Sequence, residues 1–438
     1  MRDVLILLIV FGCLPFALFE PFIGIALWTW LSVMNPHRLT WGFSYDFPFA
    51  MLTAIATLLS LLLAPKKVKF PVNGTTVTLI VFTIWMTVTY LTAIHVSYSY
   101  DMWSRISKTL LMTLVALAAV RSERQITIFV WLFVMSVAFF GIKGGVFAFL
   151  TGGEFKVWGP PESQIEDNNA ISVALVMMIP LLAYFYQHAP RRWIKPAMLA
   201  SILLCVGSIL ASYSRGAFVA ISAMLLFLAA KSRQRFLLIG LMALALPVML
   251  AAMPDAWWER MATISSSSDN PDQSVQGRYN AWHMAWNLAK DRPIFGGGFA
   301  IYESDVFARY APDPLDVHAA HSIYFQMMGE HGFVGLALFL LLAFLMWRTG
   351  TRIIRGSPPG PYQWRADLAR ALQVSMVGFL VGGITVNIGY WDVFYFELVL
   401  LVALEQLMVD TKQSAVESQE SRQSTMRPGF AKDASGIQ

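Results

Sequence analysis

The stretch HAAHSIYFQMMGEHGFVGLALFLLLAFLMW, residues 318–347, decides the fold class, because a polar segment rich in histidine passes into a long apolar run. Crossing the hydrocarbon core of a bilayer takes about 20 apolar residues in a helix. We therefore predict a transmembrane helix over 322–347, with His318, His321 and His331 near its polar start. The side of the membrane that this start faces determines what the histidines can do.

Similar apolar runs recur along the whole chain. Of its 438 residues, 57% are hydrophobic and 13% are charged, whereas soluble proteins carry about 25% charged residues. Each run should be a helix, because backbone groups in lipid need partners within their own segment. The sequence thus predicts an all-α polytopic integral membrane protein, with spans at 4–34 (broken near Glu20-Pro21), 47–64, 75–94, 106–120, 126–150, 169–187, 196–213, 216–231, 236–253, 322–347, 368–390 and 393–410.

The start of the chain, MRDVLILLIVFGCLPFALFEP, is similar to a signal peptide, but we interpret it as the first membrane segment, because it lacks a small-residue cleavage site and spans follow at once. Cys13 and Cys205 both lie in apolar segments, so no disulfide framework is expected. The net charge of +5 comes from short loops between apolar runs. It is a sign of membrane orientation and does not indicate nucleic-acid binding.

Lysine and arginine in these short loops predict the orientation, since cytoplasmic loops carry the excess. One set of loops holds four basic residues: Arg38, Arg105, Lys156 and Arg215. The alternating set holds fifteen and is predicted to be cytoplasmic: Lys66, Lys67, Lys69, Arg121, Arg124, Arg191, Arg192, Lys195, Lys231, Arg233, Arg235, Arg348, Arg352, Arg355 and Arg365. With the N-terminus also inside, residues 1–34 cross a net single time, which gives about twelve transmembrane helices.

The chain divides into four predicted parts. A transmembrane bundle (1–253) is followed by a large extracytoplasmic loop (254–321), by further transmembrane helices (322–410) and by a polar tail (411–438) that we expect to be disordered and cytoplasmic. Loops as long as 254–321 are usually functional or disordered. Aromatic residues recur at helical spacing in GRYNAWHMAWNLAKDRP, so we predict a functional, partly helical loop.

Two arginines fall on the predicted outward face. Arg215 ends the apolar run ASYSRGAF, and Arg278 opens the helix of the large loop. An arginine near the interface can simply extend its charged end toward water. Alternatively, its guanidinium can hold a phosphate through two parallel hydrogen bonds. Two such residues on one face suit a diphosphate. Lys143 lies near the outer end of its span, and Asn168 lies at the head of the next one.

The histidines allow three interpretations. His318 and His321 could share a helix face as metal ligands, with Asp313, Asp316 and Glu330 as candidate third ligands, but none of these is obviously in register, so we expect no metal. A structural role in hydrogen bonding is preferred for His318 and His331. His321 could act as a general base near neutral pH, because the partial positive charge of a helix N-terminus opposes its protonation. The Gly-rich FGGGFAIY lies outside any strand–helix context; we interpret it as a tight turn and expect no cofactor.

A known family matches these residues. His321-Ser322, then nine residues, then Gly332-Phe333-Val334-Gly335 is similar to the H-[N/S/Q]-x9-G-x-x-[G/T/Y] signature of bacterial O-antigen ligases. With its late outward loop, the chain resembles the O-antigen ligase superfamily from end to end. That superfamily also includes O-antigen polymerases and protein O-oligosaccharyltransferases. FEPFIGIALWTWLSVMNPHRLTWGF and GPPESQIEDNNAISVALVMMIPL resemble the exosortase-associated O-glycosylation ligases.

The resemblance implies a metal-independent, inverting, GT-C-like glycosyltransferase in the bacterial inner membrane, with its active site facing the periplasm. The donor would be a glycan on undecaprenyl diphosphate, and the acceptor a hydroxyl of lipid A–core. By position, the catalytic histidine falls on His321 and the arginines of the family on Arg215 and Arg278. We add Lys143 and Arg309 as further phosphate contacts, and treat four residues as motif or structural positions: Ser322, Gly332, Gly335 and Asn168.

Other functions share some of these features. An O-antigen polymerase or a protein O-oligosaccharyltransferase would use the same donor with a different acceptor. A flippase or transporter of lipid-linked glycans belongs to another class, and such proteins tend to have internal repeats with paired broken helices. We find no such repeats, and the ionisable residues gather at one surface. The sequence therefore favours the ligase.

Overall fold

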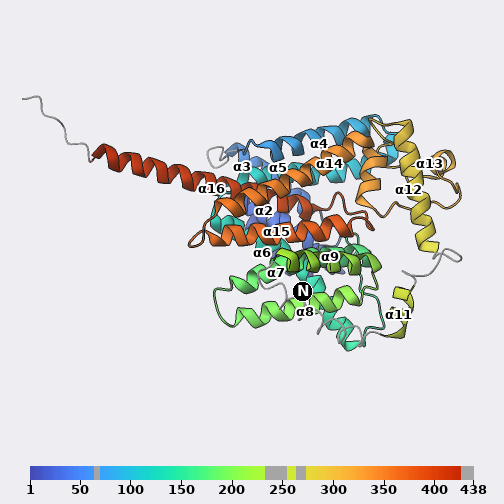
Figure 1. Ribbon diagram of the computed structural model, residues 1–438, viewed down its shortest axis with the longest axis horizontal. Helices are drawn as coiled ribbons and strands as arrows, with labels where there is room; N and C mark the ends of the chain where they lie inside the picture. The colour runs from blue at the N-terminus through green and yellow to red at the C-terminus, as the bar shows by residue number, and fades with distance from the viewer. Residues whose placement is uncertain (64–69, 232–253, 263–272, 426–438) are drawn as a thin grey trace, which may run out of the picture.

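The computed structural model describes residues 1–63, 70–231, 254–262 and 273–425, and all regular elements in these ranges are helical. The long helices lie side by side in one elongated bundle (Figure 1). Four are long and apolar enough to cross a membrane: α4 (Gly74–Leu91), α6 (Glu123–Leu150), α7 (Asn168–Gln187) and α14 (Ile323–Gly356). The predicted class, an all-α polytopic membrane protein, is confirmed.

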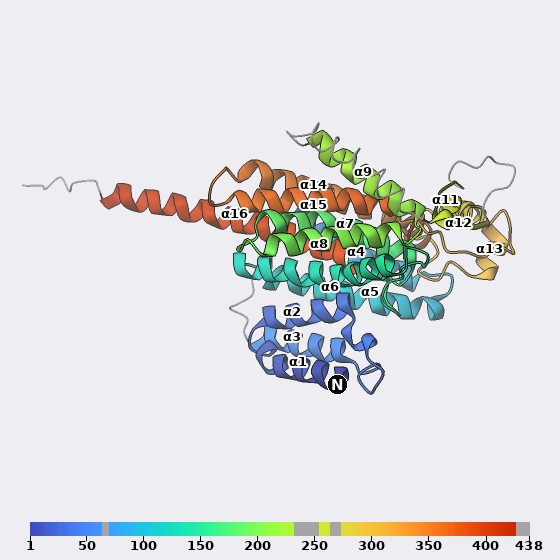
Figure 2. The same cartoon turned by 90° about the horizontal axis from the view of Figure 1, so that it is seen from below.

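The remaining elements complete the bundle and its outer loop. The bundle also contains α1 (Arg2–Ala17), α2 (Pro21–Met34), η1 (Pro36–Leu39), α3 (Phe49–Leu63), α5 (Val96–Ala119), α8 (Ile194–Leu210), α9 (Arg215–Lys231), α15 (Gln363–Gly382) and α16 (Asp392–Thr425). The large loop contributes α11 (Asp255–Ala262), α12 (Gln273–Asp291) and α13 (Ser304–Tyr310), which lie together at one end of the bundle (Figure 2). The predicted span 236–253 lies outside the described residues.

The first two helices form an antiparallel hairpin. Ile6 and Val10 of α1 pack in one cluster with Leu27 and Leu31 of α2. Proline lacks a backbone N–H and favours the first turn of a helix, so Pro21 starts a new helix where α1 has ended. The predicted single net crossing of residues 1–34 is therefore wrong.

The start of α1 lies beside the connection between α2 and α3. The Asp3 carboxylate accepts a hydrogen bond from the Ser44 N–H at 3.2 Å, and Arg2 Nη1 donates to the Leu39 carbonyl at 3.2 Å. This connection holds Arg38, which belongs to the predicted outward loops. The expectation that the N-terminus lies with the cytoplasmic loops is therefore also wrong.

Two other boundaries differ from the prediction. Arg105 was assigned to a loop but lies within α5. Residues 411–425, which were expected to be disordered, continue α16 as helix beyond the bundle (Figure 1). This extension, TKQSAVESQESRQST, holds three glutamines and two glutamates, which have high helix propensity, but also four serines and two threonines, which do not.

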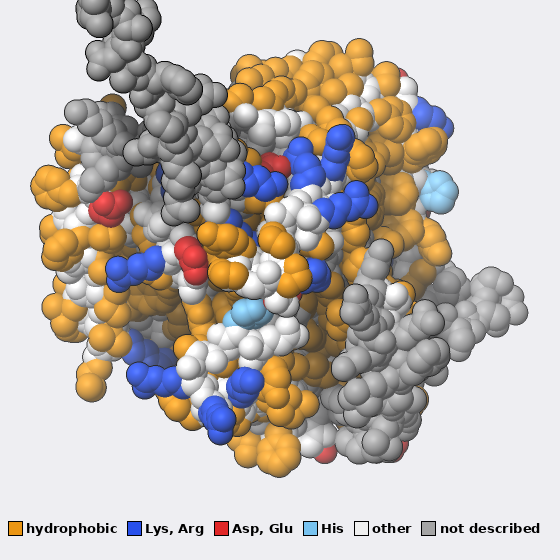
Figure 3. Space-filling model, turned by 60° about the vertical axis from the view of Figure 1, so that its left-hand side comes forward, with side chains coloured by type: hydrophobic (Ala, Val, Ile, Leu, Met, Phe, Trp, Pro, Cys, Tyr) orange, Lys and Arg blue, Asp and Glu red, His pale blue; other side chains and the backbone are white. Residues whose placement is uncertain are grey.

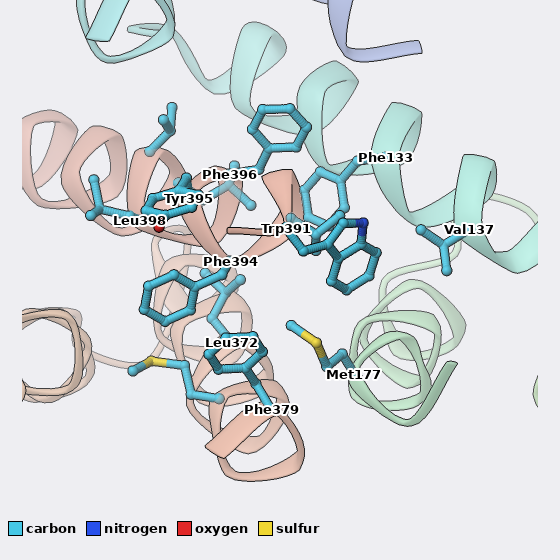
Figure 4. Packing of buried hydrophobic residues seen from close by; sticks show 14 of the residues in the cluster. Phe133, Val137, Met177, Leu372, Phe379, Trp391, Phe394, Tyr395, Phe396 and Leu398 are labelled. Carbon is cyan, nitrogen blue, oxygen red and sulfur yellow. The ribbon is translucent and has the colours of Figure 1, made fainter. Parts of the chain in front are cut away.

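The core lies where α6, α7, α15 and α16 meet (Figure 4). Phe379 of α15 stacks on Phe394 of α16 with ring centroids 4.6 Å apart. Helices in lipid associate mainly by close packing, which small residues permit. Gly145 of α6 is such a position, since a Cβ there would lie 2.2 Å from the Leu204 carbonyl oxygen of α8. Helices α6 and α8 therefore pack closely against each other near the outer end of the bundle.

The two ends of the bundle differ in charge. Figure 3 views the molecule with the end from which α16 projects turned forward, and many lysine and arginine side chains gather there. The helices of the large loop lie at the opposite end (Figures 1 and 2). This distribution agrees with the excess of basic residues that separates the two sets of short loops.

Candidate active site

The start of α14 is fixed to the connection between α15 and α16. The Ser322 N–H donates to Asn387 Oδ1 at 2.8 Å, and the Ile323 N–H donates to the Gly383 carbonyl at 2.7 Å. The free N–H groups at a helix start need such partners. The predicted span 368–390 is therefore too long, because α15 ends at Gly382 and residues 383–391 form a connection that holds the start of α14.

The starts of α7 and α9 meet the same region. Gly216, directly after Arg215, approaches Thr385 so closely that a Cβ would lie 1.9 Å from its Oγ1. Asn168 Nδ2 donates to the Ser212 carbonyl at 2.7 Å and so joins α7 to the turn before α9. Arg215 therefore begins its helix beside the connection that holds the start of α14.

The large loop packs onto the segment that carries His321. The rings of Trp282 on α12 and Phe325 on α14 are stacked 4.9 Å apart, and Trp282 Nε1 donates to the Ala320 carbonyl at 2.6 Å. Arg278 precedes Trp282 by four residues, so both lie on the same side of α12. Arg278 therefore lies on the side of α12 that packs onto the segment carrying His321. Arg278 and His321 are close enough to interact electrostatically.

His321 lies in a half-buried position just before α14. Its φ is +45°, an uncommon value for a residue other than glycine and one that is often found at functional sites. Burial lowers the pKa of the imidazole below its usual 6.5, the positive charge of Arg278 lowers it further, and the carboxylate of Asp167 opposes these effects. The ring is therefore neutral at neutral pH and can accept a proton.

His318 and His331 are in different surroundings. His318 is half exposed, and its Nδ1 lies 2.6 Å from Asp316 Oδ1. Among the described residues, no three His, Cys, Asp or Glu side chains form a group that could hold a metal ion.

His331 is fully buried and has hydrogen-bond partners on both ring nitrogens. Nδ1 lies 2.7 Å from Thr89 Oγ1, and Nε2 lies 2.6 Å from the Tyr390 hydroxyl. The Tyr390 hydroxyl also donates to Glu330. Buried polar groups are costly unless they are hydrogen-bonded, so this network explains how a histidine and a glutamate fit between apolar helices.

The first glycine of the signature breaks α14. Gly332 has φ +70° and ψ −176°, so the helix is divided into 323–331 and the longer part after it. A Cβ on Gly332 would lie 2.3 Å from the Ile294 carbonyl oxygen. A side chain at this position would therefore suffer both an unfavourable φ and a clash.

The turn at 294–298 satisfies the carbonyls that this break leaves free. The N–H groups of Gly297 and Gly298 donate to the carbonyls of Gly329 and Glu330 at 2.8 and 2.9 Å. Gly335, the second glycine of the signature, gives room to His331, since a Cβ on Gly335 would lie 2.2 Å from that of His331. The glycines of the signature thus shape the backbone.

Two of the predicted phosphate contacts lie elsewhere. Lys143 lines a groove with residues of α1 and α2. Arg309 is 70% exposed and lies 3.2 Å from Asp291 and over the ring of Tyr310. The structure brings together His321 and Arg278, and it places the start of α9 with Arg215 at the same connection. It does not bring Lys143 or Arg309 to them.

Two further residues neighbour this site: Asp167, which stands beside Asn168 at the head of a predicted span but was given no role, and Asn387, which sequence reasoning missed. Asp167 caps α7 by accepting from the N–H groups of Asn169 and Ala170 at 2.8 and 3.2 Å, and it is the acidic residue that influences His321. An aspartate before a helical run is a recognisable cap signal. Asn387 showed only as an amide inside a predicted span.

Family models cover most of the chain. Residues 199–340 match the model described as O-antigen ligase, and residues 1–190 match the model of a family of unknown function, DUF5935. The first match includes Arg215, Arg278, His321 and both signature glycines. No curated protein matches the chain. The chain is thus similar to the O-antigen ligase family over residues 199–340, about a third of its length.

Proposed function

We propose that the protein is a ligase that moves O-antigen polysaccharide from undecaprenyl diphosphate to a hydroxyl of lipid A–core. The observation that supports this most strongly is a half-buried, neutral His321 with the cation of Arg278 nearby, at the outer end of a membrane bundle. The match of residues 199–340 to the O-antigen ligase model supports a ligase or polymerase activity, and the pairing of base and cation supports transfer from a diphosphate donor.

In the proposed reaction, His321 takes the proton of the acceptor hydroxyl as that oxygen attacks the anomeric carbon of the glycan. The bond between this carbon and the diphosphate oxygen breaks, and the electron pair leaves with undecaprenyl diphosphate. Arg215 and Arg278 stabilise the charge that develops on the diphosphate. Attack opposite the leaving group inverts the anomeric carbon. A diphosphate is already a good leaving group, so the base and the two cations provide the catalysis that remains necessary.

The electrostatics of the pair suit this sequence of events. In the free enzyme, burial and Arg278 hold the pKa of His321 below 6.5, so the base is ready to accept a proton. A bound diphosphate would neutralise Arg278 and place negative charge nearby, and that charge favours the imidazolium. Donor binding would thus strengthen the base when the acceptor arrives.

We place the site on the periplasmic face of the bacterial inner membrane, because basic residues gather at the opposite end of the bundle. The connection that holds Arg38 and the start of α1 would face the periplasm, as would the loop 254–321. Residues 1–253 and 322–410 would then form the membrane bundle. The tail 411–438 would be a cytoplasmic extension.

The acceptor distinguishes this proposal from its closest alternatives. A polymerase or a protein O-oligosaccharyltransferase would share the donor site. Of these two alternatives, the N-terminal resemblance to exosortase-associated O-glycosylation ligases favours the protein O-oligosaccharyltransferase. A flippase would need no base beside the cations. The neutral His321 therefore favours an enzyme over a transporter.

The test uses purified full-length protein with an undecaprenyl-diphosphate glycan and, in separate reactions, rough lipopolysaccharide or a Ser/Thr peptide. We expect transfer to lipopolysaccharide, loss of transfer in His321→Ala, and retention of transfer in the matched variant His318→Ala. Product on the peptide alone would overturn the acceptor assignment. Normal turnover by His321→Ala would overturn the mechanism.

A further inference from the structure

A groove on the lipid-facing side of α1, α2 and α6 is separate from the site described above. Its outer part has a volume of about 350 Å³ and is lined by Arg2, Lys143 and apolar residues. A second part of about 560 Å³ shares Trp30, Met34 and Phe139 with the first. We propose that this continuous groove binds an anionic phospholipid, with its headgroup at Arg2 and Lys143.

The groove has the length and character of a site for a lipid chain. It follows α6 from Lys143 to Thr127, a distance of about 24 Å at the helical rise per residue. The hydrocarbon core of a bilayer is about 30 Å thick. Below the two cations its walls are almost entirely apolar, with Trp131 and Met135 among them. An acyl chain can therefore lie along α6 while its headgroup stays at the outer end.

The outer end of the groove carries the positive charges of Arg2 and Lys143, while the nearby carboxylate of Asp3 lines a neighbouring pocket that also contains Arg2. No acidic side chain lines this part, and Lys143 has no ion-pair partner among the residues that the structure describes. Arg2 lies over the ring of Trp41, 5.0 Å from its centroid, and keeps an exposed guanidinium. Two like charges at one mouth repel each other, and an anionic headgroup removes that repulsion. Charge complementarity thus selects an anionic lipid over a zwitterionic one.

The groove and the proposed active site lie on different sides of α6. Gly144 and Gly145 face α8, where they approach Ser208 and Leu204, whereas Lys143 faces α1 and α2. The α8 side leads to the turn that carries Arg215, so a diphosphate held at Arg215 and Arg278 is not at Lys143. All residues that line the groove lie within 1–190, the part that matches a family of unknown function. The proposal gives that part a lipid-binding role.

The experiment counts retained lipids by native mass spectrometry after reconstitution of the full chain in nanodiscs of equal phosphatidylglycerol and phosphatidylcholine. Wild-type protein should retain one phosphatidylglycerol with about 10- to 30-fold preference, from two cations near the membrane surface. Arg2→Gln/Lys143→Gln should lose this preference. The matched control Lys156→Gln/Lys290→Gln removes two exposed cations outside the groove and should behave as wild type.

Equal retention of both lipids by wild-type protein would overturn the proposal without any variant, as would an equal loss of preference in the control. Undecaprenyl diphosphate, added to wild-type protein at the same amount, should not displace phosphatidylglycerol. Displacement would assign the groove to the donor and also overturn the proposal. None of these results depends on whether His321 is the catalytic base, so the two proposals can fail separately.

Discussion

His321 and His331 lie ten residues apart, at either end of one short helical segment, in opposite environments. The ring of His331 is fully buried and bonded on both nitrogens. That of His321 is half buried at the outer end of the bundle, and its side chain makes no hydrogen bond with any described residue. Residue type alone therefore does not determine the environment of a side chain here: one imidazole is held by hydrogen bonds, and the other is the one that we propose as the base.

Replacing His321 by alanine should have the largest effect on transfer, and it should distinguish the roles of His321 and His331 most clearly. We expect transfer to fall by about 10²- to 10⁴-fold, the usual contribution of a general base. The melting temperature should stay nearly unchanged, since no hydrogen bond within the described protein is lost. Transfer kinetics and thermal unfolding in the same detergent provide the two measurements. A large fall in stability would make His321 a structural residue like His331.

The reverse pattern is expected for His331→Ala. Removal of this ring leaves the Thr89 and Tyr390 hydroxyls without their buried partner and opens a cavity, at a cost of about 2–4 kcal/mol in the free energy of unfolding. Transfer per folded molecule should change only a few-fold. Denaturation followed by tryptophan fluorescence measures the first quantity. Unchanged stability would show that the network around Glu330 does not hold the helix.

Gly332→Ala tests whether the backbone break between the two parts of α14 is required. The positive φ of Gly332 and its contact with the Ile294 carbonyl predict a loss of about 1–3 kcal/mol in stability. Gly207→Ala on α8 is the control, because nothing lies within 4 Å of its added Cβ. If both variants unfold alike, the signature glycine does not serve the geometry proposed for it.

The pH dependence of kcat/KM should show the lowered pKa of His321 directly. Only the neutral ring can act as a base, so activity should persist as the pH falls to 6.5 and decline below it. Arg278→Gln removes a cause of the lowering, so the midpoint should move to higher pH, besides any loss of rate. An unchanged midpoint would show that Arg278 does not influence the pKa of His321.

Arg309→Gln should have the smallest effect. Its exposed pair with Asp291 is of a type that contributes about 0–1 kcal/mol, and the structure does not bring Arg309 to His321. We expect transfer to change by less than about two-fold. A loss comparable to that of Arg278→Gln would return Arg309 to the set of diphosphate contacts.

Much of the bundle could be predicted because apolar runs report helices in lipid directly. The span expected at 169–187 and the observed α7 differ by one residue, and 47–64 matches α3 closely. Two of the errors came where a run contained a change of direction. Residues 1–34 fold back at Pro21, and 368–390 leaves the helix after Gly382, although both runs remain apolar. Hydropathy records burial in lipid, but it does not record where the backbone turns.

The candidate site was predictable only where a local motif marked it. The spacing of the signature pointed to His321, and two arginines stood out against an apolar background. Asp167 and Asn387 lie 154 residues before and 66 residues after His321. The cap signal at Asp167 predicts a helix start but not its proximity to His321, and no pattern marks Asn387. Lys143 was grouped with the arginines because it lies at the same depth, but it faces another side of its helix. A sequence indicates how deep a residue lies in the membrane more readily than it indicates which side of its helix the residue faces.

Because α14 breaks at Gly332, the nine residues between Ser322 and Gly332 form a helical segment of fixed length. These residues form two and a half turns of helix, anchored at one end by the glycine turn and at the other by Asn387 and Gly383. One inserted residue would rotate everything beyond it by roughly 100° and advance it by about 1.5 Å. The imidazole of His321 would then turn relative to Arg278, so the length of this segment would determine the orientation of the proposed base.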